Sequence, residues 1–516
     1  MRALRNIGWP AYLLCLAIGS LYMADSSWTS VTQHRSTYAF DRNFEAGPAI
    51  ASDVVMVVLD GLRTDAVASL PAYGRLAQAG ASGTMRVTVP SLSNPARAAF
   101  ATGAWPEVSG VTNNSTFEPV PVQSLFGLAD QRGLRSSVFG SRFWPRAFGN
   151  SVEHFSPTSR YSSYGVSELV AWQSEYCEEA LEHIAGSDAA IRVVDLQASD
   201  EAGHTYGGGS DAYREVLVAV DACLGQIMDQ VGPEVTIVAL SDHGHIHRRG
   251  RGGHGGLEPE VINAPFALAG PGVRNANQIK AQIVDIAPTL STLLGLPIAA
   301  NSQGRVLWEA LDVPAEHDAD LRQLEKEQRT ALQEHMPDRR AALRAQKSER
   351  LPWSVLIHFF TLVAIVYTAH RQRQNIKPLL AALACFVVAY FALFYAFGLG
   401  YSISSIVRQE YLYTFLAKDV AAAAAAYGIA AVVLFRLGGR RSEAAISLAV
   451  WISSVAAMLV AQVYFQFGLR MDGWMLEIGP AFQAYLHMVA IVGVVLGTLL
   501  VGALNRLVPA SQESAP

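Results

Sequence analysis

Five long apolar runs in the second half of the chain constrain its architecture more than any other feature. They cover about residues 354–370, 378–399, 412–435, 444–468 and 480–504. Each run reaches the roughly 17–25 residues that a helix needs to cross a bilayer. Because a globular core does not contain five such runs in succession, residues 351–516 are predicted to form a C-terminal transmembrane domain of about five helices.

A sixth apolar run covers residues 7–23, just after Arg2 and Arg5. A cleaved signal peptide is the alternative interpretation, but it requires a small-residue cleavage site after the run. The residues that end this run, Leu21, Tyr22 and Met23, make a poor site. Residues 1–24 are therefore predicted to be an uncleaved transmembrane anchor.

The short loops between the apolar runs predict an orientation. Arginine and lysine gather around residues 371–377 and 436–441, and loops rich in these residues face the cytoplasm. Six spans satisfy every loop if both termini are cytoplasmic. Residues 25–350 would then lie in the periplasm of a bacterium, next to its inner membrane, or in a eukaryotic lumen.

Composition agrees with a membrane domain joined to a globular one. Charged residues make up 16% of the chain, against about 25% in an ordinary soluble protein. The formal net charge of −5 gives no basic bias, so no nucleic-acid partner is expected. Residues 25–312 alternate short β-branched runs with helical stretches, which predicts an α/β domain, and residues 313–350 are predicted to be a polar helical linker.

Two pairs of residues leave alternatives open. Cys177 and Cys223 both fall in the predicted external domain, where a disulfide can persist, but the sequence does not show whether they are close. Lys418 and Asp419 lie within a predicted span. Charged residues at such positions are often functional, whereas a lysine near the end of a span can extend to the surface at low cost.

Acidic residues and histidines follow three predicted buried strands, residues 54–59, 191–196 and 235–240. Open α/β sheets place their sites at the carboxyl ends of such strands. Carboxylates and neutral imidazoles are ligands that Zn²⁺ accepts. The candidate metal ligands are therefore Asp60, Asp200, His204, Asp242, His243 and His254.

Two further expectations concern these ligands and the histidines close to them in the sequence. Asp200 and His204 are four residues apart and are expected to converge on one metal from a tight loop. His245 and His247 flank a motif but have no companion acid of their own, so they are interpreted as structural.

Ser93 is the candidate nucleophile. It is predicted to be the N-cap of a helix through residues 97–102, with Pro95 in the first turn. A helix N-terminus suits a phosphate, and a metal can activate a serine hydroxyl, which is otherwise a weak nucleophile. A plain helix cap at Ser93, or Ser91 as the nucleophile, are the alternatives.

Together these segments resemble the alkaline phosphatase superfamily, on its phosphodiesterase branch. The resemblance rests on VLDGLR at 58–63, PSLSNPARAAFATGAWPEVSGVTNN at 90–114, SDEAGH at 199–204, SDHGH at 241–245, GGHGG at 252–256 and DIAPTLSTLLGLP at 285–297. Nucleotide pyrophosphatase/phosphodiesterases share the catalytic pattern. GPI ethanolamine phosphate transferases are similar also in having an anchoring span before such a domain and several spans after it.

The resemblance implies the fold and the site. The fold class is α/β, an alkaline-phosphatase-like mixed sheet flanked by helices, plus an α-helical transmembrane domain. Two zinc ions are implied, although other divalent metals are possible. Asp60, Ser93, Asp242 and His243 would hold one ion, and Asp200, His204 and His254 would hold the other.

Two more residues acquire expected roles from the resemblance. Asn114 stands where phosphodiesterases have an asparagine that donates to a phosphoryl oxygen. Ala96 and Arg97 replace the Asn-His pair that commonly follows the proline in pyrophosphatases. Arg97 is expected either to bind the phosphate or to lie at the surface. Residues 93–97 also fit the C/S-x-P-x-R pattern of sulfatases, but the other segments fit that family less well.

The function implied by the resemblance is that of a membrane-bound dizinc phosphotransferase with a phosphoserine intermediate. It would move a phosphoethanolamine-like head group from a phospholipid to a glycan or lipid acceptor. The alternative is a membrane-bound phosphodiesterase or phosphatase that hydrolyses lipid-linked or nucleotide phosphodiesters. A catalytically inactive scaffold is a third hypothesis, but every expected ligand position is filled.

The orientation can be tested with reporter fusions. We expect fusions after Lys377 and after Arg441 to report the cytoplasm, and a fusion near Asp472 to report the opposite side, because positively charged loops stay on the cytoplasmic side. An external signal from the fusion after Arg441 would contradict the arrangement of six spans.

Overall fold

The computed structural model describes residues 2–115, 118–159, 165–248, 251–336, 339–371, 376–400, 403–405, 409–437, 442–469 and 478–507. The described residues form two compact units. One unit contains residues 31–336, and the other contains residues 2–30 and those from 339 onward. The division of the chain into anchor, domain, linker and membrane segments at the predicted boundaries stays a prediction.

The first unit is built on one sheet of eight strands in the order β4-β3-β5-β1-β6-β7-β2-β8. At its centre, β5 (Ile191–Leu196), β1 (Val54–Leu59) and β6 (Thr236–Leu240) lie side by side and parallel. These are the three predicted strands. The others are β2 (Ala81–Arg86), β3 (Ser136–Phe139), β4 (Glu153–Phe155), β7 (Asn263–Ala269) and β8 (Ala276–Gln282). Because β7 runs antiparallel to β6 and β2, the sheet is mixed.

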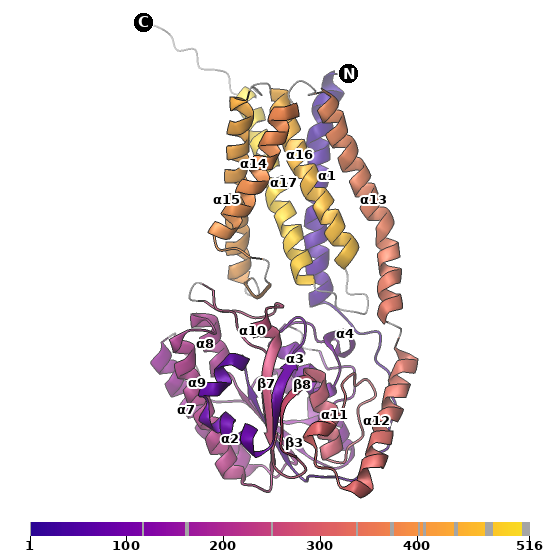
Figure 1. Ribbon diagram of the computed structural model, residues 1–516, viewed down its shortest axis with the longest axis vertical. Coiled ribbons are helices and arrows are strands. Elements are labelled where there is room, and N and C mark those ends of the chain that lie inside the picture. Colours follow the sequence, from indigo (N-terminus) through magenta and orange to yellow (C-terminus); the bar gives the residue numbers. More distant parts are fainter. Residues whose placement is uncertain are drawn as a thin grey trace. The chain divides into compact units, whose positions relative to one another are not determined.

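The central strand is apolar along its whole length because helices cover both faces of the sheet. Val54, Met56 and Val58 point into a core that contains residues of α3 (Ser93–Thr102) and α11 (Ile286–Leu293). The alternate residues of β1 point into a second core with α2, α7 and α9, since successive side chains of a strand face opposite ways. Figure 1 shows these helices around the strands. The predicted fold class, a mixed sheet flanked by helices, is confirmed.

The remaining helices of this unit are mostly short. Their bounds are α2 Pro71–Ala79, α4 Pro106–Ser109, α5 Leu125–Gln131, α6 Phe143–Phe148, α7 Val166–Gly186, α8 Ala198–Tyr206, α9 Asp211–Val231, α10 Pro259–Ile262 and α12 Ala315–His335. A disulfide between Cys177 and Cys223 joins α7 to α9. This answers the question of pairing that the sequence left open.

Helix α12 lies within the predicted linker, and two of its polar side chains are bound to the loop before it. The Glu325 carboxylate accepts hydrogen bonds from the Val306 amide at 2.9 Å and the Trp308 indole at 2.6 Å. The Gln328 amide donates to the carbonyl oxygens of Ala299, Ala300 and Ser302. Helix α12 is therefore part of the packed first unit.

The second unit is helical. It contains α1 (Arg2–Thr32), which continues past Ser30, together with α13 (Arg339–Arg371), α14 (Ile376–Ala396), α15 (Gln409–Arg436), α16 (Ser442–Phe467) and α17 (Ile478–Leu507). Five helices, α13 to α17, contain segments long and apolar enough to cross a membrane. The predicted C-terminal spans are thereby confirmed, and the chain is a multi-pass membrane protein.

Helix α1 is not among these five, but it packs with them. The Tyr12 hydroxyl lies 2.7 Å from the Ser454 hydroxyl of α16, and Leu13 is buried against Ala449 and Val495. The N-terminal span and the orientation stay predictions. Several loop residues behind the orientation, including Arg373, Arg441 and Asp472, lie outside the described residues.

The charged pair in α15 separates into two different environments. Lys418 is exposed, whereas Asp419 is fully buried. Asp419 accepts hydrogen bonds from the Tyr390 hydroxyl of α14 at 2.6 Å and from His487 Nδ1 of α17 at 2.9 Å. Side chains that hydrogen-bond across helices stabilise membrane bundles. Asp419 therefore connects three of the helices.

The disulfide yields a stability prediction. The double variant Cys177→Ala/Cys223→Ala should lower the free energy of unfolding of the first unit by about 2–4 kcal/mol, because the cross-link restricts the unfolded chain. Denaturant unfolding of the full chain in detergent would measure this. The control is Cys15→Ala/Cys385→Ala, which removes the two unpaired cysteines and should leave this transition unchanged. Equal stability of both double variants would contradict the prediction.

Candidate metal centre and active site

The candidate ligands gather at one edge of the sheet. Asp60 directly follows β1, Asp242 lies two residues after β6, and α8 begins two residues after β5. Because these three strands are parallel neighbours, their carboxyl ends meet at the same edge. This is where α/β sheets place their sites.

The first group of ligands consists of Asp60, Asp242 and His243, all buried. His243 Nε2 lies 3.4 Å from Asp60 Oδ1 and 3.6 Å from Asp242 Oδ2. Within the described residues, neither of these carboxylate oxygens has a hydrogen-bond partner. Buried carboxylates are costly unless a cation or hydrogen bonds satisfy them. The group therefore fits a divalent cation.

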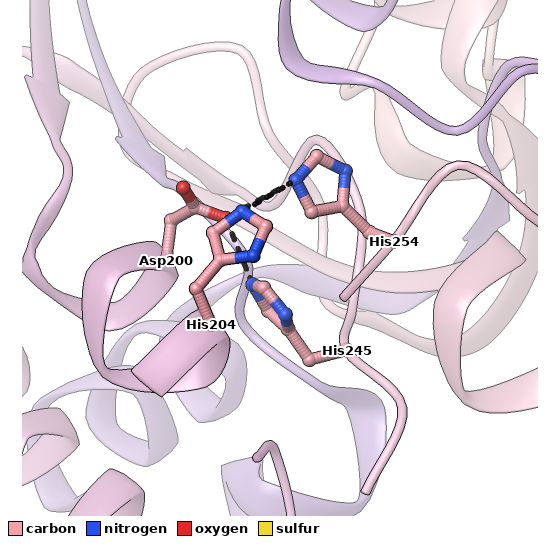
Figure 2. Close-up of side chains that lie close together, drawn as sticks. All are labelled: Asp200, His204, His245 and His254. Carbon is pink, nitrogen blue, oxygen red and sulfur yellow. Dashed lines mark hydrogen bonds and ion pairs between the residues drawn. The ribbon is translucent and has the colours of Figure 1, made fainter. Parts of the chain in front are cut away.

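The second group contains Asp200, His204, His245 and His254 (Figure 2). Asp200 Oδ1 lies 3.5 Å from Nε2 of both His204 and His254, and these two Nε2 atoms are 3.1 Å apart. The expected tight loop is wrong, because Asp200 and His204 lie on helix α8. Residues four apart lie on the same helix face, so the helix brings both side chains together.

The interpretation of His245 as a histidine without an acidic companion is wrong. Its Nε2 lies 2.8 Å from Asp200 Oδ1, and its side chain is fully buried. The acid is 45 residues away in the sequence, so local pattern could not reveal it. His247 is exposed and belongs to neither group.

The two groups are adjacent. The imidazole rings of His243 and His254 stack, with their centroids 3.7 Å apart and an interplanar angle of 9°. One histidine belongs to each group. The two groups therefore lie side by side at this edge of the sheet.

Ser93 lies beside the first group. It is the first residue of α3, and Leu92 occupies the cap position, so the predicted N-cap is wrong by one residue. The Ser93 hydroxyl lies 3.2 Å from His243 Nε2. The positive end of the α3 dipole lies at the same place, which favours negative charge there.

Ser91, the alternative nucleophile, is held by the glycine loop. Its hydroxyl donates to the Gly256 carbonyl at 2.9 Å and accepts from the Gly255 amide at 3.0 Å. Its carbonyl oxygen lies 2.9 Å from His254 Nδ1. A hydrogen on Nδ1 leaves the lone pair of His254 Nε2 directed at the second group, as in many metal-binding histidines.

Asn114 is fixed against the start of α3. Its Oδ1 accepts a hydrogen bond from the Asn94 amide at 3.0 Å, and its carbonyl oxygen accepts from Asn94 Nδ2 at 3.1 Å. Asn114 itself is exposed. With Oδ1 engaged, its side-chain NH₂ group is available as a donor.

Arg97 is buried, so the expectation of a surface position is wrong. Its Nη2 donates to Asp60 Oδ2 at 2.6 Å and to Asp195 Oδ1 at 2.8 Å. Asp195 also accepts from the Trp144 indole at 3.1 Å. Arg97 therefore holds one oxygen of Asp60 and leaves the other facing His243. Phosphate binding by Arg97 stays a prediction.

Burial is the largest cause of the pKa shifts in the first group. It raises the pKa of Asp60 well above its usual range, and the neighbouring Asp242 adds to the effect. It also raises the pKa of Asp242 to about 6 and lowers that of His243 well below its usual value. His243 is thus kept as neutral imidazole, the form that binds metals. A bound cation would favour the charged carboxylates.

In the second group, neighbouring histidines outweigh burial in setting the pKa of the carboxyl group. Burial alone would raise the pKa of Asp200, but His204 and the other two histidines hold that pKa well below its usual range. Asp200 is therefore kept as a carboxylate. Both groups thus combine carboxylate oxygens and imidazole nitrogens, the donor set that suits Zn²⁺ and similar divalent ions.

Two family matches cover this part of the chain. Residues 54–154 match the family described as type I phosphodiesterase / nucleotide pyrophosphatase, and residues 149–298 match the metalloenzyme superfamily. All the candidate site residues fall within these ranges. The predicted enzyme class, a metal-dependent phosphotransferase or phosphodiester hydrolase, agrees with both descriptions.

The relatives each match about half of the chain. The catalytic subunit of human GPI ethanolamine phosphate transferase 2 is 26% identical in an alignment of 287 positions that covers 51% of this chain and 28% of the relative. Human GPI ethanolamine phosphate transferase 1 is 23% identical over 306 residues, 50% of this chain and 32% of the relative. The matches therefore span about a third of the length of these curated relatives.

Among solved structures, murine ectonucleotide pyrophosphatase / phosphodiesterase 5 is 14% identical, with a TM-score of 0.40 over 48% of this chain and 96% of that one. The family matches, by contrast, describe one continuous stretch, residues 54–298. Residues 54–298 are therefore similar to phosphodiesterases and metalloenzymes, and the resemblance that the motifs predicted is confirmed for this part of the chain.

Proposed function

We propose that this protein is a membrane-bound phosphotransferase that moves a phosphoethanolamine-like head group from a phospholipid to a glycan or lipid acceptor. The observation that carries the proposal is the pair of adjacent ligand groups beside the Ser93 hydroxyl. The similarity to GPI ethanolamine phosphate transferases and the five membrane helices support a lipid donor.

In this proposal two zinc ions occupy the two groups. Asp60, Asp242 and His243, with Ser93, would hold one ion, and Asp200, His204 and His254 would hold the other. When bound, such ions lower the pKa of a hydroxyl and neutralise charge on phosphoryl oxygens. The buried, unpartnered oxygens of Asp60 and Asp242 support this assignment within the described residues.

The chain's own residues then perform two in-line displacements. The Ser93 oxygen forms a bond to phosphorus, and the bond from phosphorus to the diacylglycerol oxygen breaks, with the serine proton leaving on the alcohol. An acceptor hydroxyl next attacks the phosphorus of the phosphoethanolamine group on Ser93. The bond from phosphorus to the Ser93 oxygen breaks, and Ser93 takes the proton of the acceptor hydroxyl. The Asn114 amide donates to a phosphoryl oxygen, and preorganised donors of this kind favour the transition state.

The reaction is proposed to occur outside the cytoplasm. The Cys177–Cys223 disulfide supports this location, since disulfides persist in the periplasm and in the secretory lumen. The loop charges support the same orientation, with both termini in the cytoplasm. A phospholipid of the outer or lumenal leaflet would then be the donor.

A hydrolase is the second candidate, and the phosphodiesterase family match favours it. The same residues would carry out the first displacement. Only the acceptor would differ, because water would replace the glycan or lipid hydroxyl in the second displacement.

Ser93 provides the test of the first displacement. Ser93→Ala should abolish turnover while thermal stability stays close to that of the parent, because the hydroxyl caps no helix. Metal content should also stay close, because Asp60, Asp242 and His243 remain to hold that ion. Turnover of a chromogenic phosphodiester and metal analysis would measure this. Ser91→Ala should keep the nucleophile but weaken the glycine loop. Activity retained in Ser93→Ala and lost in Ser91→Ala would contradict the assignment.

The donor and acceptor can be identified from products. The full chain, purified in detergent and loaded with zinc, is incubated with phosphatidylethanolamine labelled in its head group. We expect diacylglycerol and a peptide in which Ser93 carries the labelled phosphoethanolamine group, both detected by mass spectrometry. Addition of a glycolipid acceptor should move the label onto it. Labelled free phosphoethanolamine as the main product despite the acceptor would favour the hydrolase instead.

A further inference from the structure

The buried histidine beside the second ligand group, His245, occupies a slot formed by glycines. Its imidazole packs against Gly61 and Gly203, which belong to the two motifs that supply Asp60 and His204. A Cβ atom at Gly61 would lie 2.9 Å from Cδ2 and Nε2 of the His245 ring, and one at Gly203 would come closer still. Both motifs thus leave space for this ring.

The ring contacts Asp200 more closely than the other histidines do. His245 Nε2 is 2.8 Å from Asp200 Oδ1, a normal hydrogen-bond distance. The corresponding distances for His204 and His254 are both 3.5 Å. Figure 2 shows His245 directed at the same carboxylate oxygen that faces the other two rings.

The second nitrogen of His245 adds support to what the short contact with Asp200 indicates, namely that Nε2 is a hydrogen-bond donor. An imidazole that binds a metal through Nε2 carries its hydrogen on Nδ1, and that N–H normally has an acceptor. His254 has one, the Ser91 carbonyl. Within the described part of the chain, His245 Nδ1 is buried without a partner. A hydrogen on Nε2 instead makes a hydrogen bond to Asp200 and leaves no N–H unsatisfied.

We propose that His245 is a positioning residue that donates its Nε2 hydrogen to Asp200 and fixes the oxygen that faces His204 and His254. The second ion would then have three protein ligands, and His245 would act through Asp200. Catalytic zinc sites commonly combine three protein ligands with an open position. This inference rests on the proposed metal site but not on the identity of the donor or acceptor.

The test measures metal affinity rather than activity. The full chain is purified in detergent, freed of metal, and titrated with Zn²⁺ against a chelating dye. His245→Leu should lower the affinity for one of two ions by about 10- to 100-fold, the usual effect of losing such a partner. His245→Gln keeps an N–H donor and should recover most of this loss. Its Co²⁺-loaded absorption spectrum should match the parent's, because the ligands are unchanged.

Two further variants act as checks. Gly203→Ala should displace the His245 ring and weaken the same ion without altering any ligand. Its control is Gly74→Ala, a helical glycine with open space around its Cβ position, which should bind both ions like the parent. His247→Leu, at an exposed position outside both groups, should do the same. Thermal unfolding of each variant confirms that it is folded.

Three results would overturn the proposal. If His245→Gln loses as much affinity as His245→Leu and its Co²⁺ spectrum changes, His245 is itself a ligand. If the His245→Leu variant binds both ions as tightly as the parent, His245 does not position Asp200 for metal binding. A parent chain that binds no divalent ion would overturn the proposed metal site as well, and so is distinguishable from the first two.

Discussion

The contact of Arg97 with Asp60 and Asp195 constrains the geometry of the site, because it joins a guanidinium and two carboxyl groups in the interior of the first unit. Removing one partner from such a buried arrangement typically costs about 3–5 kcal/mol, since the remaining charge is left uncompensated. Because of this contact, the two oxygens of the Asp60 carboxylate have different partners. One oxygen is bound by the guanidinium, and the other faces His243 beside the Ser93 hydroxyl.

The arrangement of strands extends this geometry to the second group. Strands β5 and β6 both pair with β1, so the segments that follow them converge around Asp60. The segment after β5 supplies Asp200 and His204, and the segment after β6 supplies His243 and His245. Ser91 fixes the glycine loop through its hydroxyl and accepts a hydrogen bond from His254. Each ligand group is therefore supported by neighbours that do not themselves bind metal.

Much of this could be predicted from the sequence because the decisive signals were local. The strand at 54–59 is a continuous apolar run, the strand at 191–196 is mostly apolar, and both end at the predicted residues. The five C-terminal spans could be predicted from the length and hydropathy of the runs alone. The helix at Asp200 was missed, although acidic residues in a first turn favour a helix N-terminus, because the Asp-His spacing also suits a loop.

The remaining errors concern contacts between distant segments. The partner of His245 follows a different strand. Arg97 contacts one carboxylate directly after β1 and another on β5, so neither contact has a local signature. Helix α12 lies in the predicted linker, and its composition is polar. It nevertheless buries Leu321, Glu325, Gln328 and Ala331 on one face, where two polar side chains satisfy backbone groups. Burial of hydrogen-bonded polar residues is invisible to a hydropathy pattern.

The central claim is that the two groups of carboxylates and imidazoles hold two divalent ions beside Ser93. Anomalous X-ray diffraction from zinc-loaded crystals of the full chain, recorded above and below the zinc absorption edge, tests this most directly. The account predicts two anomalous peaks, one among Asp60, Asp242 and His243 and the other among Asp200, His204 and His254. A single peak, or peaks only at other residues, would contradict it.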